Sequence, residues 1–136
     1  MNSLSAAQAE WEAAAVPYPL LHKQSYGKVV EEPFRKYGDA IAWLEWEGLC
    51  TIVKIETLSP RSGAASLLLS FLKAVAMKRG IRIYGNPVVY KPTCPLAGAA
   101  PLSQEELNAW YSKRGFVVGW SANGVPCLWY PNALGL

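Results

Sequence analysis

Hydrophobic and polar positions alternate most clearly in the middle of the chain, in neighbouring runs that favour β-strands. Residues Ala40 to Trp46 and Leu49 to Thr57 are rich in β-branched and aromatic side chains, and Glu47-Gly48 between them predicts a tight hairpin turn. Both faces of the second run are largely apolar, which is typical of a central strand covered on both sides. Strict alternation would place Leu49, Thr51, Val53, Ile55 and Thr57 on one face and Cys50, Ile52, Lys54, Glu56 and Leu58 on the other.

A helical period follows directly after a turn of small residues. Between Ser66 and Arg79 nearly every residue is apolar, except for a narrow polar stripe at helical spacing that includes Ser66, Ser70 and Lys73. We therefore predict a helix that is buried over most of its circumference and packs on the sheet. Gly80 is placed to end this helix.

The N-terminal third combines a predicted helix with a stretch of less regular patterning. Residues 3 to 15 are rich in Ala, Gln and Glu after a capping serine, and the run Val16-Pro17-Tyr18-Pro19 cannot continue a helix. Beyond this run, residues 26 to 30 predict a strand. Residues 32 to 37 predict a short helix with Pro33 in its first turn.

The C-terminal part predicts a strand, a loop, a helix and a closing hairpin. Residues 81 to 90 favour a strand, whereas residues 91 to 101 are proline-rich and lack periodicity, as a loop does. Ser103 and Glu106 have the spacing of a capping box, and the helix that they begin ends at Lys113-Arg114-Gly115. The closing strands are predicted at residues 116 to 120 and 126 to 130.

These elements predict a single domain over residues 1–136, which is long enough for one substantial core. The expected fold class is α/β (α+β), with a mixed, mostly antiparallel central sheet and helices on both faces. A hydrophobic content of 51% and an aromatic content of 12% argue against disorder.

Charge and cysteine usage narrow the function classes. The net charge of +3 is mild and its Lys and Arg residues are scattered, which permits an anionic ligand but does not favour nucleic acid. No apolar run reaches membrane-spanning length, and the N-terminus lacks the basic start of a secretory signal. Three widely spaced cysteines fit a reducing compartment, and a single histidine leaves a metal site poorly supplied with ligands. We expect a cytoplasmic, metal-free protein.

The strand, turn and helix around residues 49–79 have the order that builds an anion site. The first N–H groups of a helix have no intrahelical partner, and the helix dipole adds partial positive charge there. Gly63 lets a ligand approach the backbone, and Arg61 would add a full charge. We predict a phosphate-binding turn. The alternative is that Gly63-Ala64-Ala65 only allows the helix to pack closely on its sheet.

Two segments of the chain resemble the GCN5-related N-acetyltransferase (GNAT) superfamily. Residues 63 to 80 are similar to its acetyl-CoA-binding segment, through Gly63, Ala65, Ser66, Leu68, Leu69, Leu72, Ala76, Arg79 and Gly80. The run from Trp110 to Phe116 resembles the superfamily's Tyr-x-x-x-Gly-Phe segment. The segments occur in the superfamily's order, and the resemblance covers residues 52 to 118, which is about half of the chain.

The resemblance implies an acyl-CoA-dependent N-acyltransferase in which an amine attacks the thioester directly. Acetyl-CoA or another acyl-CoA would be the co-substrate, with its pyrophosphate on the turn and its pantetheine arm along the end of the preceding strand. Tyr111 matches the tyrosine that often protonates the departing thiolate, a role that suits a phenol because its reference pKa is about 10. Glu56 is the candidate base. The implied cofactor-binding residues are Thr57, Leu58, Ser59, Arg61, Ser62, Gly63, Ala64, Ala65 and Ser66.

Each of these roles has a purely structural alternative, and one position departs from the superfamily pattern. Pro60 stands where the superfamily usually has Arg or Gln, so Arg61 must replace that residue or cofactor affinity suffers. Tyr111 can be a core aromatic residue, and Glu56 a paired or solvated carboxylate. The alternative function is therefore a catalytically degraded GNAT-fold protein that binds or regulates. A transferase acting on nucleic acid is a third option.

The acceptor has no readable motif in the sequence. A primary amine on a protein or on a small molecule would suit the chemistry, and no membrane partner is expected. The final hairpin, ending in Leu128-Trp129-Tyr130, offers an edge on which a second copy could pair as a homodimer.

Overall fold

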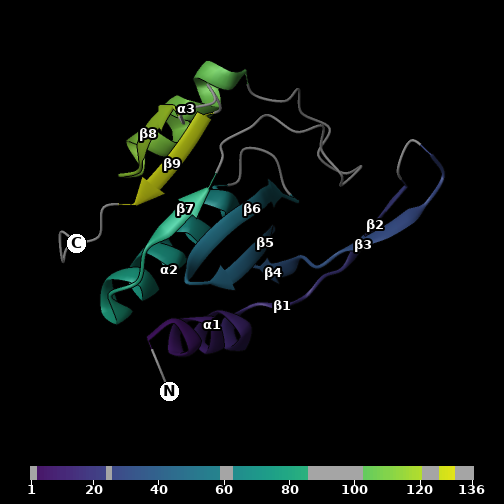
Figure 1. The fold of residues 1–136 in the computed structure, drawn as a ribbon, viewed down its shortest axis with the longest axis horizontal. Coiled ribbons are helices and arrows are strands. Elements are labelled where there is room, and N and C mark those ends of the chain that lie inside the picture. Colours follow the sequence, from purple (N-terminus) through teal and green to yellow (C-terminus); the bar gives the residue numbers. More distant parts are fainter. Residues whose placement is uncertain (1–2, 24–25, 59–62, 86–102, 121–125, 131–136) are drawn as a thin grey trace.

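The computed structural model describes residues 3–23, 26–58, 63–85, 103–120 and 126–130 (Figure 1). Three helices and nine strands lie within these ranges. The helices are α1 (Ser3–Ala14), α2 (Ala64–Arg79) and α3 (Gln104–Lys113). The strands are β1 (Val16–Pro17), β2 (Leu20–Lys23), β3 (Val29–Glu32), β4 (Arg35–Tyr37), β5 (Ala40–Glu47), β6 (Leu49–Thr57), β7 (Ile83–Gly85), β8 (Val117–Trp120) and β9 (Pro126–Tyr130).

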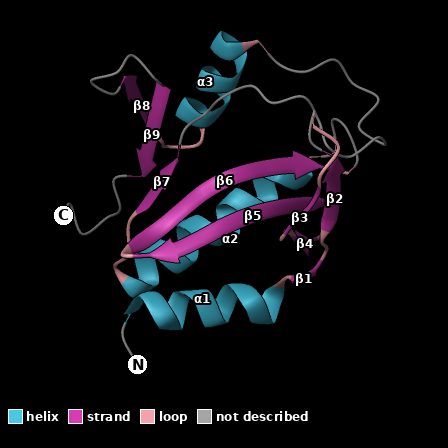
Figure 2. Cartoon of the chain, turned by 45° about the vertical axis from the view of Figure 1, so that its right-hand side comes forward, coloured by secondary structure: helices cyan, strands magenta, loops and turns pink. Residues whose placement is uncertain are grey.

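The main sheet has seven strands in the order β1-β4-β5-β6-β7-β9-β8, and β2 pairs with β3 separately. The pairing of β6 with β7 is parallel, whereas the other ladders of this sheet are antiparallel. A parallel pair needs a crossover connection, and α2 supplies it (Figure 2). The predicted fold class, a mixed α/β domain on a mostly antiparallel sheet, is confirmed.

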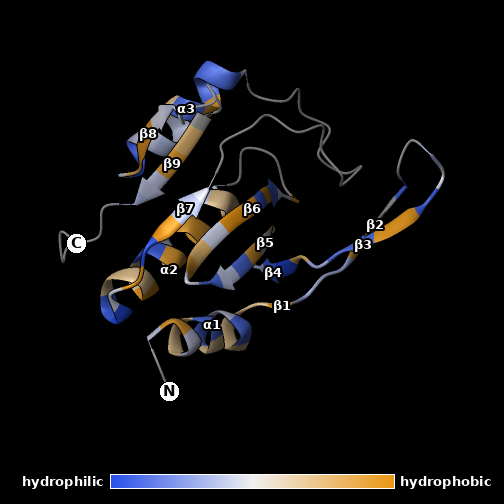
Figure 3. Ribbon diagram, viewed as in Figure 1, coloured by the Kyte–Doolittle hydropathy of each residue, from blue (hydrophilic) through white to orange (hydrophobic). Residues whose placement is uncertain are grey.

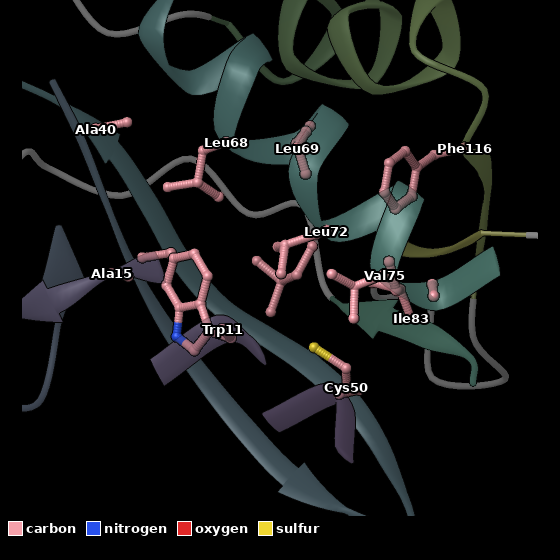
Figure 4. Packing of buried hydrophobic residues seen from close by; sticks show 14 of the residues in the cluster. Trp11, Ala15, Ala40, Cys50, Leu68, Leu69, Leu72, Val75, Ile83 and Phe116 are labelled. Atoms are coloured by element: carbon pink, nitrogen blue, oxygen red, sulfur yellow. The ribbon is translucent and has the colours of Figure 1, made fainter. Parts of the chain in front are cut away.

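The hydrophobic core lies between α1, α2 and the sheet. Trp11 from α1 and three leucines of α2 pack over Cys50 of β6 and Ile83 of β7 (Figure 4). Leu68 and Leu69 are fully buried, and burying a leucine stabilises the fold by roughly 2 kcal/mol. Phe116, which precedes β8, and Tyr111 of α3 belong to the same cluster, so the C-terminal part is packed into one core with the rest.

Local signals correctly predicted the helices, the central hairpin and the closing hairpin. The predicted helix over residues 3 to 15 is α1, the hairpin is β5 and β6, and the capping box begins α3. The first helical turn of α3 is hydrophilic, whereas β6 and β7 carry hydrophobic residues (Figure 3). Helix α2 begins at Ala64, two residues earlier than predicted, and its N-cap is Gly63.

Of the two predictions for residues 26 to 37, the strand is displaced and the short helix was wrong. The predicted strand at 26 to 30 is displaced, because Gly27 has a φ of 88° in a turn and β3 starts only at Val29. The predicted short helix at 32 to 37 is instead strand β4, which pairs with both β1 and β5. The Arg35 Nε–H donates to the Ala15 carbonyl oxygen at 2.9 Å, at the end of α1. These tertiary contacts override the local preference of the segment.

A register shift changes the faces of β6. Trp43 of β5 lies opposite Lys54, but the next residue, Leu44, lies opposite Ile52, so Val53 is an extra residue in the ladder. Cys50 and Ile52 therefore share the core face with Ile55, which packs against the same cluster. Strict alternation, which placed Ile55 opposite Cys50 and Ile52, was wrong because of this bulge.

Of the predicted segments 81–90 and 91–101, the structure describes β7, and residues 86–102 lie outside the described part. No helix among the described residues has the length and apolar character needed to cross a membrane. Within the same residues, no group of three or more His, Cys, Asp or Glu side chains could hold a metal ion.

Candidate functional site

Helix α2 begins directly after Gly63. This residue is the N-cap, with φ 77° and ψ 6°, and its carbonyl oxygen accepts the Leu67 N–H at 3.0 Å. A Cβ atom placed on Gly63 would meet none of the described residues within 4 Å. Because glycine has no side chain, it cannot cap the first N–H groups of the helix as Ser or Asp would. Gly63 therefore gives the first turn of α2 no side-chain cap.

Not every predicted residue of this turn can be placed. Ser59, Arg61 and Ser62 lie outside the described residues, together with Pro60. Their proposed contacts with a cofactor stay predictions. Ala64, Ala65 and Ser66 form the first turn of α2 immediately after Gly63, as the phosphate-binding interpretation requires.

The ladder between β6 and β7 is short among the described residues. The parallel ladder covers only Cys50 to Ile52, so among the described residues the second half of β6 has a ladder with β5 alone. Gly85 allows the close approach at the end of the ladder, because a Cβ atom there would lie 3.0 Å from the Ile52 carbonyl oxygen. The Leu58 N–H donates to the Asp39 carbonyl oxygen at 2.7 Å. Any pairing of Leu58 with a ligand would therefore use its carbonyl group.

Tyr111 is held in an aromatic cluster. Its ring meets Trp110 edge-on at 5.0 Å between centroids and Phe116 at 5.6 Å, and only 6% of the residue is exposed. The Tyr111 carbonyl oxygen accepts the N–H groups of Arg114 at 3.0 Å and of Phe116 at 3.2 Å. Burial raises the pKa of the phenol above its ordinary value, because the charged form is poorly solvated there. The hydroxyl group therefore keeps its proton at neutral pH.

Glu56 lies on the other face of β6. Its cross-strand partner is Ile41, and the carboxylate is partly buried, with Oε2 shielded from solvent. Lys54, two residues earlier on this face, forms an ion pair with Glu32 at 2.7 Å between Nζ and Oε2. Tyr111 belongs to the core cluster on the opposite side. Among the described residues, the structure therefore shows no contact between the two predicted catalytic groups.

Arg114 joins the segments that the sequence singled out. Its Nε–H donates to Ser66 Oγ at 2.9 Å, and its Nη1–H to the Trp110 carbonyl oxygen at 2.9 Å. The guanidinium group lies 4.1 Å from the centre of the Trp110 ring. Lys73 Nζ donates to the Arg114 carbonyl oxygen at 2.7 Å. The first turn of α2 and the end of α3 are thus in direct contact, although Ser66 and Arg114 are 48 residues apart.

Sequence reasoning treated Arg114 only as the basic end of a helix. The polar stripe of α2 was the signal that could have identified it, because Ser66 and Lys73 of this stripe contact Arg114. A hollow of about 280 Å³ lies elsewhere, between α1 and β5. Its lining includes Trp11, Arg35 and Trp46 and none of the predicted site residues.

Comparisons with known proteins complete these findings. No protein-family model matches the chain, and no curated protein sequence matches it. Among solved structures, the chain is similar to the anti-CRISPR protein AcrVA5, with 18% sequence identity and a TM-score of 0.46. The alignment covers 85% of this chain and 98% of that one.

Proposed function

We propose that the protein is an acyl-CoA-dependent N-acyltransferase, which transfers an acyl group, acetyl in the simplest case, to a primary amine. The observation that carries this proposal is the contact between Ser66 and Arg114 at 2.9 Å. It joins the start of α2, which has Gly63 as its N-cap, to the segment that contains Tyr111. Both segments resemble parts of one acyltransferase superfamily, and a shared site requires them to be neighbours.

The turn at Gly63 suits a pyrophosphate. A Cβ atom on Gly63 would meet none of the residues that the structure describes within 4 Å, and the dipole of α2 favours an anion at this end. The end of β6 would hold the pantetheine arm, whose amides would pair with backbone groups near Thr57 and Leu58. Ser59, Arg61 and Ser62 would complete the turn. An acyl-CoA would supply the activated acyl group.

The reaction needs orientation and two proton transfers. The amine nitrogen forms a bond with the thioester carbonyl carbon, the C–S bond breaks, and the amide product keeps the acyl group. The amine gives one proton to a base, for which Glu56 is the candidate, directly or through water. The leaving thiolate takes one proton from the Tyr111 hydroxyl group. Burial keeps that proton on Tyr111 in the resting protein, as the raised pKa of the phenol indicates.

Calorimetric titration with acetyl-CoA and with CoA tests the binding step. We expect saturable binding of both, and no detectable heat at millimolar ligand would overturn the proposal. Thiol release with a panel of amines then separates a protein acceptor from a small-molecule acceptor. The panel would include lysine-containing peptides, polyamines and amino sugars.

Tyr111→Phe tests the proton donor. We expect thiol release to fall at least about 100-fold, since general acid catalysis typically contributes this much. The affinity for CoA should remain within about threefold of the wild type, because the hydroxyl group is remote from the phosphate turn in this proposal. An unchanged rate would remove Tyr111 from the chemistry.

A second function, from another class, is a GNAT-fold protein that binds a CoA ester or a partner without catalysis. The specific observation in its favour is that Tyr111 is only 6% exposed and packs within the core cluster. In that case CoA would bind, no amine in the panel would stimulate thiol release, and Tyr111→Phe would change stability alone.

A further inference from the structure

The polar stripe of α2 has a structural role. Ser66 and Lys73 are seven residues apart, which is about two helical turns, so they lie on one side of the helix. Both contact Arg114: Ser66 accepts from its guanidinium group, and Lys73 donates to its main-chain carbonyl oxygen. The stripe is therefore the line along which α2 meets the end of α3.

The guanidinium group of Arg114 holds α3 as well as α2. Of its five N–H donors, one binds Ser66 Oγ and another binds the Trp110 carbonyl oxygen. Its plane also lies over the Trp110 ring, at 4.1 Å from the ring centre. A planar fork can make these contacts together, whereas a lysine ammonium group cannot.

Tyr111 is fixed by the same residue and by its neighbours. The main-chain N–H of Arg114 donates to the Tyr111 carbonyl oxygen at 3.0 Å, and the Trp110 ring packs edge-on against the Tyr111 ring. Trp110 is therefore held by Arg114 on one side and contacts Tyr111 on the other. A displacement of the Arg114 side chain would move both aromatic rings relative to the first turn of α2.

We infer that Arg114 is a positioning residue, which holds the Tyr111 hydroxyl group in place relative to the phosphate-binding turn. This inference rests on the proposed function. A thioester held at the turn must present its sulfur to the proton donor, and errors of about 1 Å in such an alignment can cost on the order of 100-fold in rate. The Arg114 fork is the direct link between the two parts of the site.

A kinetic double-mutant cycle tests the link. Tyr111→Phe should lower kcat at least about 100-fold in the wild-type background but less than about tenfold in Arg114→Gln, because the hydroxyl group is already misplaced there. The KM for acetyl-CoA in Arg114→Gln should stay within about threefold of the wild type. Equal effects of Tyr111→Phe in both backgrounds would overturn the inference.

Two further variants separate geometry from charge and protect the test against misfolding. Arg114→Lys keeps the charge but loses the fork, so we expect kcat to fall about as far as in Arg114→Gln. Wild-type kcat in Arg114→Lys would overturn the inference. Ser66→Ala removes only the contact to α2, and we expect a several-fold loss of kcat at an unchanged melting temperature.

The exposed neighbour Lys113 provides a matched control. Lys113→Gln removes a positive charge from the same helix end, and we expect kcat within about twofold of the wild type, since exposed charges contribute little. A loss in this variant as large as in Arg114→Gln would overturn the inference. Absence of turnover by the wild-type protein would overturn the proposed function and this inference with it. Additive effects in an active protein would overturn the inference alone.

Discussion

The two helices of the candidate site begin in opposite ways. Helix α3 is closed by its own side chains: Ser103 Oγ accepts the Glu106 N–H at 3.1 Å, and Glu106 Oε1 accepts the Ser103 N–H at 3.0 Å. Helix α2 begins at Gly63, which has no side chain and a left-handed conformation. The N-cap residue of α3 satisfies helix donors with its side chain, whereas the N-cap residue of α2 has no side chain to do so.

The difference indicates which helix end is suited to a ligand. A capping box adds stability but occupies the N–H groups that an anion would use. A glycine N-cap gives up that stabilisation and leaves room for an approaching group. Ser66 in the first turn of α2 is, in addition, bound by the cationic side chain of Arg114. The open helix end therefore combines access with positive charge.

Among changes that test the contrast between the two helix ends, substitution at Gly63 should have the largest effect. Gly63→Val places a β-branched side chain over the open turn, and we expect the affinity for acetyl-CoA to fall at least about 30-fold. Isothermal titration measures this loss. Gly48→Val is the matched control, because Gly48 also has a positive φ, of 72°, and open space around it, in the β5–β6 turn. Both variants incur a left-handed strain of roughly 1–2 kcal/mol, so an equal loss of affinity in both would contradict the prediction.

The next effect in size concerns the closed helix end. Ser103→Ala removes the side-chain cap of α3, and we expect a loss of about 1 kcal/mol in the free energy of unfolding, measured by urea denaturation. The affinity for acetyl-CoA should not change. Ser112→Ala, at an exposed position within α3, is the control and should leave stability within about 0.5 kcal/mol. Weaker binding of acetyl-CoA by Ser103→Ala would contradict the prediction that, of the two helix starts, only that of α2 binds the cofactor.

Salt should weaken the binding of acetyl-CoA, through its phosphate contacts, by a smaller factor. Raising ionic strength from about 0.05 M to about 0.5 M screens charges at an accessible helix end, so we expect the dissociation constant for acetyl-CoA to rise severalfold. S-acetylpantetheine lacks the phosphates, and its affinity should stay constant over the same range. The same salt response for both thioesters would indicate that the open turn does not bind phosphate.

Acid should weaken the closed helix end and produce the smallest effect. The hydrogen bonds from the Ser103 backbone and side chain lower the pKa of Glu106 below its ordinary value. A lowered pKa in the folded state means that the stabilisation is present above the pKa of the unfolded chain and is lost as pH falls through the folded pKa. We expect the stability difference between the wild type and Glu106→Gln to shrink as pH is lowered from about 6 to about 3. A difference that grows on acidification would contradict this assignment.

Local chemistry explains why much of the fold was predictable. The β5–β6 hairpin, the apolar α2 and the capping box of α3 are each encoded by neighbouring residues, and each was predicted near its observed position. Strand β4 was missed because its conformation depends on pairing with β5 and on the contact of Arg35 with the end of α1. Neither contact leaves a trace in the local pattern.

The same distinction applies to the candidate site. The glycine turn and the Tyr111 segment were found because each is a short pattern, and the structure brings the two segments together. The contact that joins them was not predicted, because Ser66 and Arg114 are 48 residues apart and an arginine at a helix end has many ordinary roles. The face of β6 on which Glu56 lies depends on the extra residue in this strand, and the alternation of polar and apolar residues in the sequence does not reveal that residue.

That extra residue sets the phase of the second half of β6. In a regular strand of the same sequence every side chain after Ile52 would turn to the other face, so Glu56 would enter the helix-covered side and Thr57 would leave it. The backbone groups that lead into the Gly63 turn would also move by one residue along the strand. The strand should therefore tolerate a change of residue type at Val53, provided that the bulge is kept. In this domain, one extra residue in the ladder of β6 is itself a determinant of the site.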